Sequence, residues 1–195
     1  MQKIAKGVIL TCRSEFLPDK LRMRYTVANR GSEDIYLLDV YPGGDPESKK
    51  AAGDYNSVYA CLKDSDVAYL LKGIPPLPKD RLVYVRIMPL GAKLAPGKSF
   101  ERVFEVSLPL REQNRWYYAT LRLEDYETVK VKTLILAVQF LRSTVEGFHA
   151  EPSPYGPGLF RVQGQDTVRQ AETMTCEIAV QDLQMLTRKD MFSRE

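Results

Sequence analysis

Histidine, cysteine and tryptophan are scarce in this chain of 195 residues, which contains one, three and one of them. A single imidazole cannot supply a metal site built from two or three histidines, and the spacings HExxH and CxxC do not occur. Glycine-rich phosphate loops of the forms GxGxxG and GxxxxGK[ST] are absent as well. We therefore expect no metal site, no cofactor and no nucleotide-dependent chemistry.

The sequence also lacks long apolar runs. No stretch reaches the roughly 18 apolar residues that a membrane-spanning helix needs, because Gln139 interrupts the best candidate, Leu134 to Leu141. The N-terminal segment has a lysine within its apolar part and no small-residue cleavage site after it, so it does not resemble a secretory signal. These features predict a cytoplasmic protein without a membrane span, or a secreted or periplasmic one if a leader has been removed.

Charge of one sign does not dominate. The chain has 28 basic and 25 acidic side chains and a net charge of +3, too little to attract nucleic acid strongly, so no nucleic-acid partner is expected. The three cysteines, Cys12, Cys61 and Cys176, cannot all pair within one chain, which favours reduced thiols. Cys12 and Cys176 occupy inward positions of alternating segments, where a thiol packs as a small apolar residue. A disulfide between them requires that their strands be neighbours.

Alternation of apolar and polar residues is the main pattern that is present. From Leu21 to Ala28 every second side chain is apolar, as on a half-buried strand. The turn residues Asn29-Arg30-Gly31 end this strand, and a second one follows from Ile35 to Tyr41, so the two form a hairpin or a corner. The same period predicts further strands at Ile4–Cys12, Ser57–Leu62, Val67–Leu71, Leu82–Met88, Phe100–Leu108, Tyr117–Leu123, Val129–Leu141, Leu159–Val162 and Met174–Val180.

Many short strands, frequent turn signals and almost no helix predict an all-β fold. An antiparallel β-sandwich is the first choice, and a jelly roll or barrel is the alternative. We expect a single domain over 1–195 with insertions near 42–81 and 142–172. Residues 134–138 are apolar on both faces and predict the most buried strand. Thr167 with Gln170 indicates a short helical turn, and the segment from Leu183 to Met191 indicates a C-terminal helix.

Two segments resemble immunoglobulin-like or fibronectin-like domains of bacteria. The segment from Tyr25 to Ile35 is similar to their strand, Asn-x-Gly turn and strand, and the segment from Leu94 to Glu101 has a Leu-x-Pro-Gly turn that leads into an alternating strand. The resemblance implies an immunoglobulin-like sandwich with extra strands and says little about activity. Trp116 lies far from the position that packs on the antibody disulfide, which argues against a disulfide of that type.

Few residues suggest catalysis, and no catalytic residue is predicted. His149 lies in a loop-like stretch, and the chain has no GxSxG elbow, so we interpret this side chain as a rim histidine. Turn residues are the favoured interpretation of the clustered acids, and an enzyme that uses carboxylates alone is the less favoured one. Two groups of acids are candidates for the pair that a glycosidase needs: Glu124-Asp125 with Glu127, and Asp64 with Asp66.

An aromatic and basic strand face gives the one positive indication of binding. In the strand predicted near residue 120, the residues at 117, 119, 121 and 123 form the better core face, which leaves aromatic and basic residues on the opposite face. Such residues are enriched at protein interfaces and on sugar-stacking platforms. The alternative is that a loop, 42–56 or 150–160, covers this strand face. Three tyrosines in or beside loops are candidates to enlarge a binding surface: Tyr41, Tyr55 and Tyr155. The predicted binding residues are Arg115, Trp116, Tyr118 and Arg122.

These observations favour a non-catalytic binding module whose partner is another protein. The alternative is a carbohydrate-binding or carbohydrate-processing domain in which Trp116 and Tyr118 stack on a sugar ring. Exposed edge strands also allow a homodimer through extension of a sheet.

Overall fold

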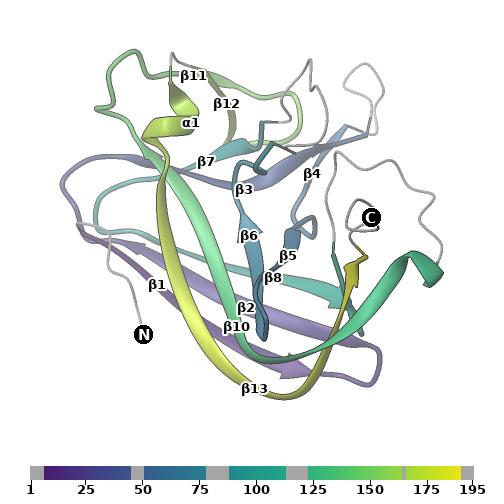
Figure 1. Cartoon of the computed structure of the whole chain (residues 1–195). Coiled ribbons are helices and arrows are strands. Elements are labelled where there is room, and N and C mark those ends of the chain that lie inside the picture. Colours follow the sequence, from purple (N-terminus) through teal and green to yellow (C-terminus); the bar gives the residue numbers. More distant parts are fainter. Residues whose placement is uncertain (1–6, 45–50, 78–87, 113–122, 164–165, 190–195) are drawn as a thin grey trace.

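The computed structural model describes residues 7–44, 51–77, 88–112, 123–163 and 166–189. Within these ranges the fold is all-β, with two sheets packed against each other as in a sandwich (Figure 1). In the described part of the chain no helix has the length and apolar character needed to cross a membrane. The strands are β1 (Val8–Phe16), β2 (Lys20–Asn29), β3 (Ile35–Gly43), β4 (Ala52–Asp54), β5 (Tyr59–Asp64), β6 (Val67–Lys72), β7 (Leu90–Leu94), β8 (Ser99–Ser107), β9 (Leu110–Arg111), β10 (Tyr126–Arg142), β11 (His149–Pro152), β12 (Leu159–Gln163) and β13 (Glu172–Arg188), and the helical turns are η1 (Leu123–Asp125) and α1 (Thr167–Gln170).

The two sheets differ in size. The smaller one is antiparallel, with the order β1-β2-β8. The larger one has ten strands and the main order β11-β12-β7-β3-β10-β13-β9, with β4 beside β3 and the β5–β6 hairpin beside β10. Two pairs in the larger sheet, β6 with β10 and β9 with β13, are parallel. The long strands β10 and β13 of this sheet are paired with each other and curve together (Figure 1).

The predicted strands are largely confirmed within the described ranges. β2 alternates between buried and more exposed residues, and residues 134–138 of β10 are all buried, between β13 and β6. The helical turn predicted at Thr167 is α1. Strands β4, β7, β9 and β11 were not predicted. The strands predicted from Leu82 and from Tyr117 lie outside the described residues except for their last residues, Met88 and Leu123.

The predicted C-terminal helix is wrong, because β13 continues as a strand to Arg188. Between Val131 and Thr133 of β10 the register shifts, and β13 accommodates extra residues there, with Asp182 at a φ of 55°. This irregularity places buried side chains at 180 and 183, a spacing that imitates a helix turn. Pairing with β10 overrides that local signal.

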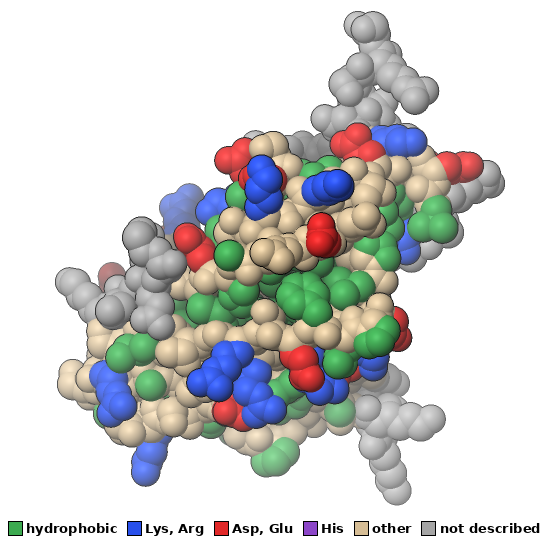
Figure 2. All heavy atoms as spheres, turned by 90° about the horizontal axis from the view of Figure 1, so that it is seen from below, with side chains coloured by type: hydrophobic (Ala, Val, Ile, Leu, Met, Phe, Trp, Pro, Cys, Tyr) green, Lys and Arg blue, Asp and Glu red, His purple; other side chains and the backbone are tan. Residues whose placement is uncertain are grey.

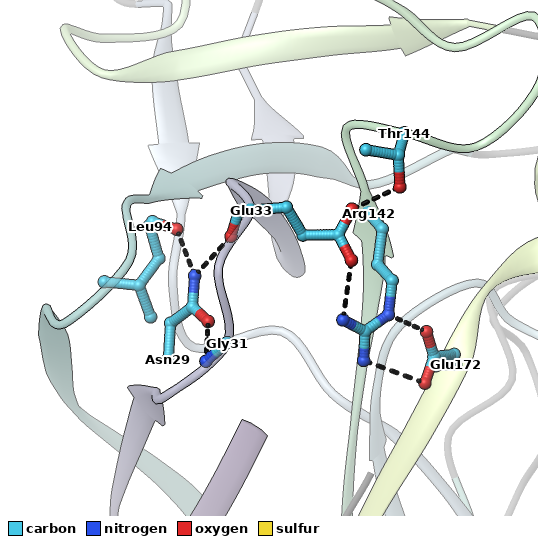
Figure 3. Close-up of polar contacts among 7 residues, drawn as sticks. All are labelled: Asn29, Gly31, Glu33, Leu94, Arg142, Thr144 and Glu172. Carbon is cyan, nitrogen blue, oxygen red and sulfur yellow. Dashed lines mark hydrogen bonds and ion pairs between the residues drawn. The ribbon is translucent and has the colours of Figure 1, made fainter. Parts of the chain in front are cut away.

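The connection from β2 to β3 is a corner, since the two strands belong to different sheets. The Asn29 amide nitrogen donates to the backbone oxygens of Glu33, at 2.8 Å, and of Leu94, at 3.0 Å. Its amide oxygen accepts the N–H of Gly31 at 3.0 Å (Figure 3). The side chain that favours a turn in the sequence therefore also holds β7 against the corner.

Arg142, at the end of β10, ties this corner to β13. Its Nη1 lies 2.9 Å from the carboxylate of Glu33, and its Nε donates to the carboxylate of Glu172 (Figure 3). Glu33 also accepts a hydrogen bond from the hydroxyl of Thr144, and these bonds lower the pKa of Glu33. The Arg142 side chain is only 16% exposed, and its guanidinium group contacts a carboxylate on each of two sides.

Replacement of this arginine gives a first testable prediction. We expect Arg142→Met to lower the free energy of unfolding by about 2 kcal/mol, because charge-assisted hydrogen bonds to two half-buried carboxylates are lost. The control is Arg24→Gln, which removes an ion pair with Glu101 whose two side chains are 54% and 55% exposed. Urea titration should find the control close to the wild type. Equal losses for both variants would contradict the role given to Arg142.

The main core lies between the inner faces of the two sheets, with side chains from β1, β2 and β8 on one side and from β3, β6, β10 and β13 on the other. A second cluster covers the opposite face of β3, where Tyr36 packs on Phe148 and Phe160 at ring-centroid distances of 4.8 and 5.5 Å. β3 is therefore buried on both faces from Ile35 to Tyr41. The region predicted as an insertion, 142–172, carries β11, β12 and α1. The extent of the domain stays a prediction.

A disulfide joins the two sheets. Cys12 of β1 is bonded to Cys176 of β13, with 6.3 Å between the Cα atoms and a sequence separation of 164. The expectation of reduced thiols is therefore wrong for this pair, because strands so far apart in sequence become neighbours only in the packed sandwich. Cys61 is free and half-buried, and burial raises the pKa of its thiol.

Candidate functional site

The four predicted binding residues, Arg115, Trp116, Tyr118 and Arg122, lie outside the described residues, so that surface stays a prediction. The three tyrosines expected to enlarge a binding surface differ from one another. Tyr41 is buried, and its hydroxyl donates to the backbone oxygen of Gly73 at 2.5 Å. Tyr155 packs against the core, and Tyr55 is 40% exposed.

The other candidate residues are spread over turns and edges. His149 lies in strand β11 rather than in a loop, is exposed, and has its Nε2 3.1 Å from a carboxylate oxygen of Glu151. Asp64 and Asp66 flank the predicted reversal between β5 and β6. Glu124 and Asp125 form part of η1. Across the described ranges, no group of three or more histidine, cysteine, aspartate or glutamate side chains is arranged to hold a metal ion.

An unexpected feature is a carboxylate enclosed between the sheets. Asp39 of β3 is 1% exposed, and its Oδ2 accepts a hydrogen bond of 2.7 Å from the hydroxyl of Tyr25 in β2. The Nε of Arg102 in β8 lies 3.5 Å from the same oxygen. Asp39 falls where β3 bulges against β7, between the pairs formed by Leu37 and Val40. A bulge breaks the alternation of a strand and redirects a side chain, which explains why the pattern did not single out this residue.

Burial dominates the electrostatics of this cluster. It raises the pKa of Asp39, while the hydrogen bond from Tyr25 and the charges of Arg102 and Lys72 act in the opposite direction. Burial, together with Asp39, raises the pKa of Tyr25 well above its usual value. Oδ1 of Asp39 and Nε of Arg102 are buried and have no hydrogen-bond partner among the described residues. Such groups are rare in native structures and call for an explanation.

Lys72 of β6 fixes the turn beside this cluster. Its Nζ donates to the backbone oxygens of Tyr55, at 2.5 Å, and of Ser57, at 2.8 Å. The carboxylate of Asp54 accepts the N–H of Ser57 at 3.0 Å, as expected of an aspartate that begins a turn. The turn between β4 and β5 is thereby held in one conformation, with the Tyr55 ring at the surface.

Arg102 connects the buried carboxylate to that surface. Its guanidinium carbon lies 4.7 Å from the ring centroid of Phe100 and 5.2 Å from that of Tyr55, distances at which cation–π attraction acts. The side chain is 25% exposed. Nε is buried and has no hydrogen-bond partner among the described residues. Nη1 and Nη2 make no hydrogen bond within the described part of the chain either. We call Arg102, Tyr55, Phe100 and Asp39 the Arg102 site.

The Arg102 site lies on an edge strand. β8 pairs with β2 on one side, and no other described strand pairs with it. Its inner face carries Phe100, Arg102, Phe104 and Val106 in alternation. At the end of this row a cavity of 260 Å³ opens next to Val106. The other lining residues are Ala60, Ser107, Pro109, Leu110, Arg111, Leu123 and Leu186.

On the outer face of the same sheet, the acidic residues of β8 are paired with basic residues of β2. Glu105 lies 3.0 Å from Lys20 and 2.8 Å from Arg22, and Glu101 lies 2.5 Å from Arg24. Figure 2, in which the molecule is seen from the side where β1 and β2 lie, shows Lys and Arg side chains beside Asp and Glu side chains. The charges of this face are therefore largely compensated within the small sheet.

Comparison with known proteins finds no protein family, no curated protein and no solved structure that matches this chain.

Proposed function

We propose that this chain is a non-catalytic, immunoglobulin-like β-sandwich module that binds another protein by adding an extended segment of that protein to β8. The observation that carries the proposal is the open edge of β8, whose nine residues pair with a described strand on one side only. A strand edge offers a row of backbone donors and acceptors that an extended peptide can satisfy. The packing of two sheets against each other supports the sandwich part of this assignment.

Specificity would come from the side chains beside the edge. In strand addition the backbone supplies affinity, and pockets for alternate side chains supply selectivity. The cavity next to Val106 is lined mainly by apolar groups and is large enough for one aliphatic or aromatic side chain. The proposed partner is therefore a protein with an extended segment that carries an apolar anchor.

We also propose that the protein works in an oxidising compartment, in place of the cytoplasm expected at first. Disulfides persist in secreted and periplasmic proteins and are rare in reducing compartments. The pairing of Cys12 with Cys176 supports this location.

Peptide display on the intact chain tests the function. Random nine-residue peptides are selected on immobilised protein, and the best binders are added to the protein in solution while amide hydrogen exchange is measured. We expect slower exchange of amides in β8 upon binding and no change in β1, the other edge strand of the same sheet.

Three results would overturn the proposal. One is that no peptide binds, and another is that the bound peptides leave the exchange of β8 amides unchanged. The third is that no peptide binds but a glycan from an array does, and that this glycan quenches the fluorescence of the single tryptophan, Trp116. Sedimentation of the free protein decides whether a second copy occupies the edge, because a stable dimer that protects β8 amides would replace the foreign segment as the occupant.

A further inference from the structure

We infer that the segment bound along β8 carries a carboxylate that pairs with the guanidinium group of Arg102, four residues away from an apolar side chain that enters the cavity beside Val106. This inference rests on the proposed function and specifies the chemistry of the partner: an acidic residue and an apolar residue in the i and i+4 positions of an extended chain, in either order along the chain.

Unsatisfied donors are the first argument. Among the described residues, the carboxylate paired with Arg102 is that of Asp39, whose Oδ2 lies 3.5 Å from Nε. Nη1 and Nη2 make no hydrogen bond within the described part of the chain. A carboxylate from a partner supplies two acceptors for Nη1 and Nη2.

Pre-organisation is the second argument. The planar fork of arginine matches a carboxylate in a bidentate arrangement, and the gain is greatest where the fork is already fixed. Here the aromatic rings of Phe100 and Tyr55 and the buried Asp39 hold the guanidinium group before a partner arrives. Tyr55 is itself fixed through Lys72.

Spacing is the third argument. Arg102 and Val106 lie on the same face of β8, four residues apart. At about 3.3 Å per residue this is a separation of roughly 13 Å, and a strand paired with β8 repeats at the same rise. Two side chains of the partner that point to the same face at i and i+4 therefore meet the Arg102 site and the cavity together.

The test uses the peptides selected on the full-length chain. The acid–x–x–x–apolar spacing, or its reverse, is expected to be enriched among them. In one such peptide the acidic residue is changed to glutamine, and in the protein Arg102 is changed to glutamine. Each change alone should raise Kd about 10- to 100-fold. The two changes together should raise Kd little more than either one alone, because both remove the same contact. Arg13→Gln, an exposed residue on β1 that loses the same charge, should leave Kd unchanged.

Thermal unfolding is measured first to establish that the Arg102→Gln variant is folded. If it is not, the peptide with glutamine in place of its acidic residue still tests the inference on the unchanged protein. Peptides that bind β8 without any acidic preference, or whose affinity survives the change of the acidic residue, overturn the inference and leave the proposed function intact. A failure of every peptide to bind β8 overturns the proposed function as well.

Discussion

Asp39→Ala lowers the free energy of unfolding by about 3–5 kcal/mol, the loss expected when one partner is removed from a buried charged cluster. The hydroxyl of Tyr25 then has no acceptor, and Arg102 loses the carboxylate nearest to its buried Nε. Urea titration at neutral pH measures the effect. A loss below about 1 kcal/mol would show that these groups find other partners and that Asp39 does not organise the cluster.

Asp39→Asn is the matched control for Asp39→Ala, and comparison of its free energy of unfolding with that of the wild type gives a prediction that depends on pH. Asparagine keeps an acceptor for Tyr25, so this variant loses less stability than Asp39→Ala. Because the pKa of Asp39 is raised in the folded state, the wild-type protein holds its proton to a higher pH when folded than when unfolded. The contribution of Asp39 to stability therefore falls as the pH rises from the unfolded pKa, about 3.9, to the folded pKa, and is constant above it.

The stability of the asparagine variant relative to the wild type should rise across that pH window and then level off. Urea titrations of both proteins at a series of pH values measure this difference, and the titrations of all other groups cancel in it. A difference that falls as the pH rises would mean that the charges of Arg102 and Lys72 outweigh burial.

The second large effect is that of the disulfide. Replacement of both Cys12 and Cys176 by alanine should cost about 2–5 kcal/mol, near the upper end because the bridge spans a sequence separation of 164. Cys61→Ala is the control, and its effect should be much smaller because that thiol is free and half-buried.

Thiol titration of the denatured protein provides an independent check of the pairing. One reactive thiol is expected before reduction and three after it, since Cys61 is the free cysteine. Three thiols before reduction would contradict the link between the sheets.

The fold class could be predicted because most strands are half-buried, and burial on one face leaves the alternation that is visible in β2. β7 was not predicted as a strand because it is short and contains Gly91. Glycine is needed there because Val162 packs against this position: a Cβ atom would lie 2.6 Å from a Val162 methyl group. The C-terminal part of β13 was not predicted as a strand because the irregularity near Asp182 shifts the alternation of buried and exposed residues. Both cases show local geometry set by a neighbouring strand.

The Arg102 site could not be predicted for a different reason. Its parts come from β3, β8 and the turn after β4, and only the packed sheets bring them together. Asp39 is the one charged residue in an otherwise apolar run from Ile35 to Val40, and that was the available signal. A charge in so apolar a strand indicates that it has a buried partner in the folded protein.

The proposed binding mode requires an open edge at β8, and amide hydrogen exchange of the free, full-length chain tests this edge directly. We expect every amide of β2, which pairs with β1 and with β8, to exchange slowly. In β8, amides that point toward β2 should exchange slowly and the alternate ones quickly, because no described strand accepts their hydrogen bonds. Uniformly slow exchange along β8 would show that another segment already occupies the edge and would contradict the proposed binding mode.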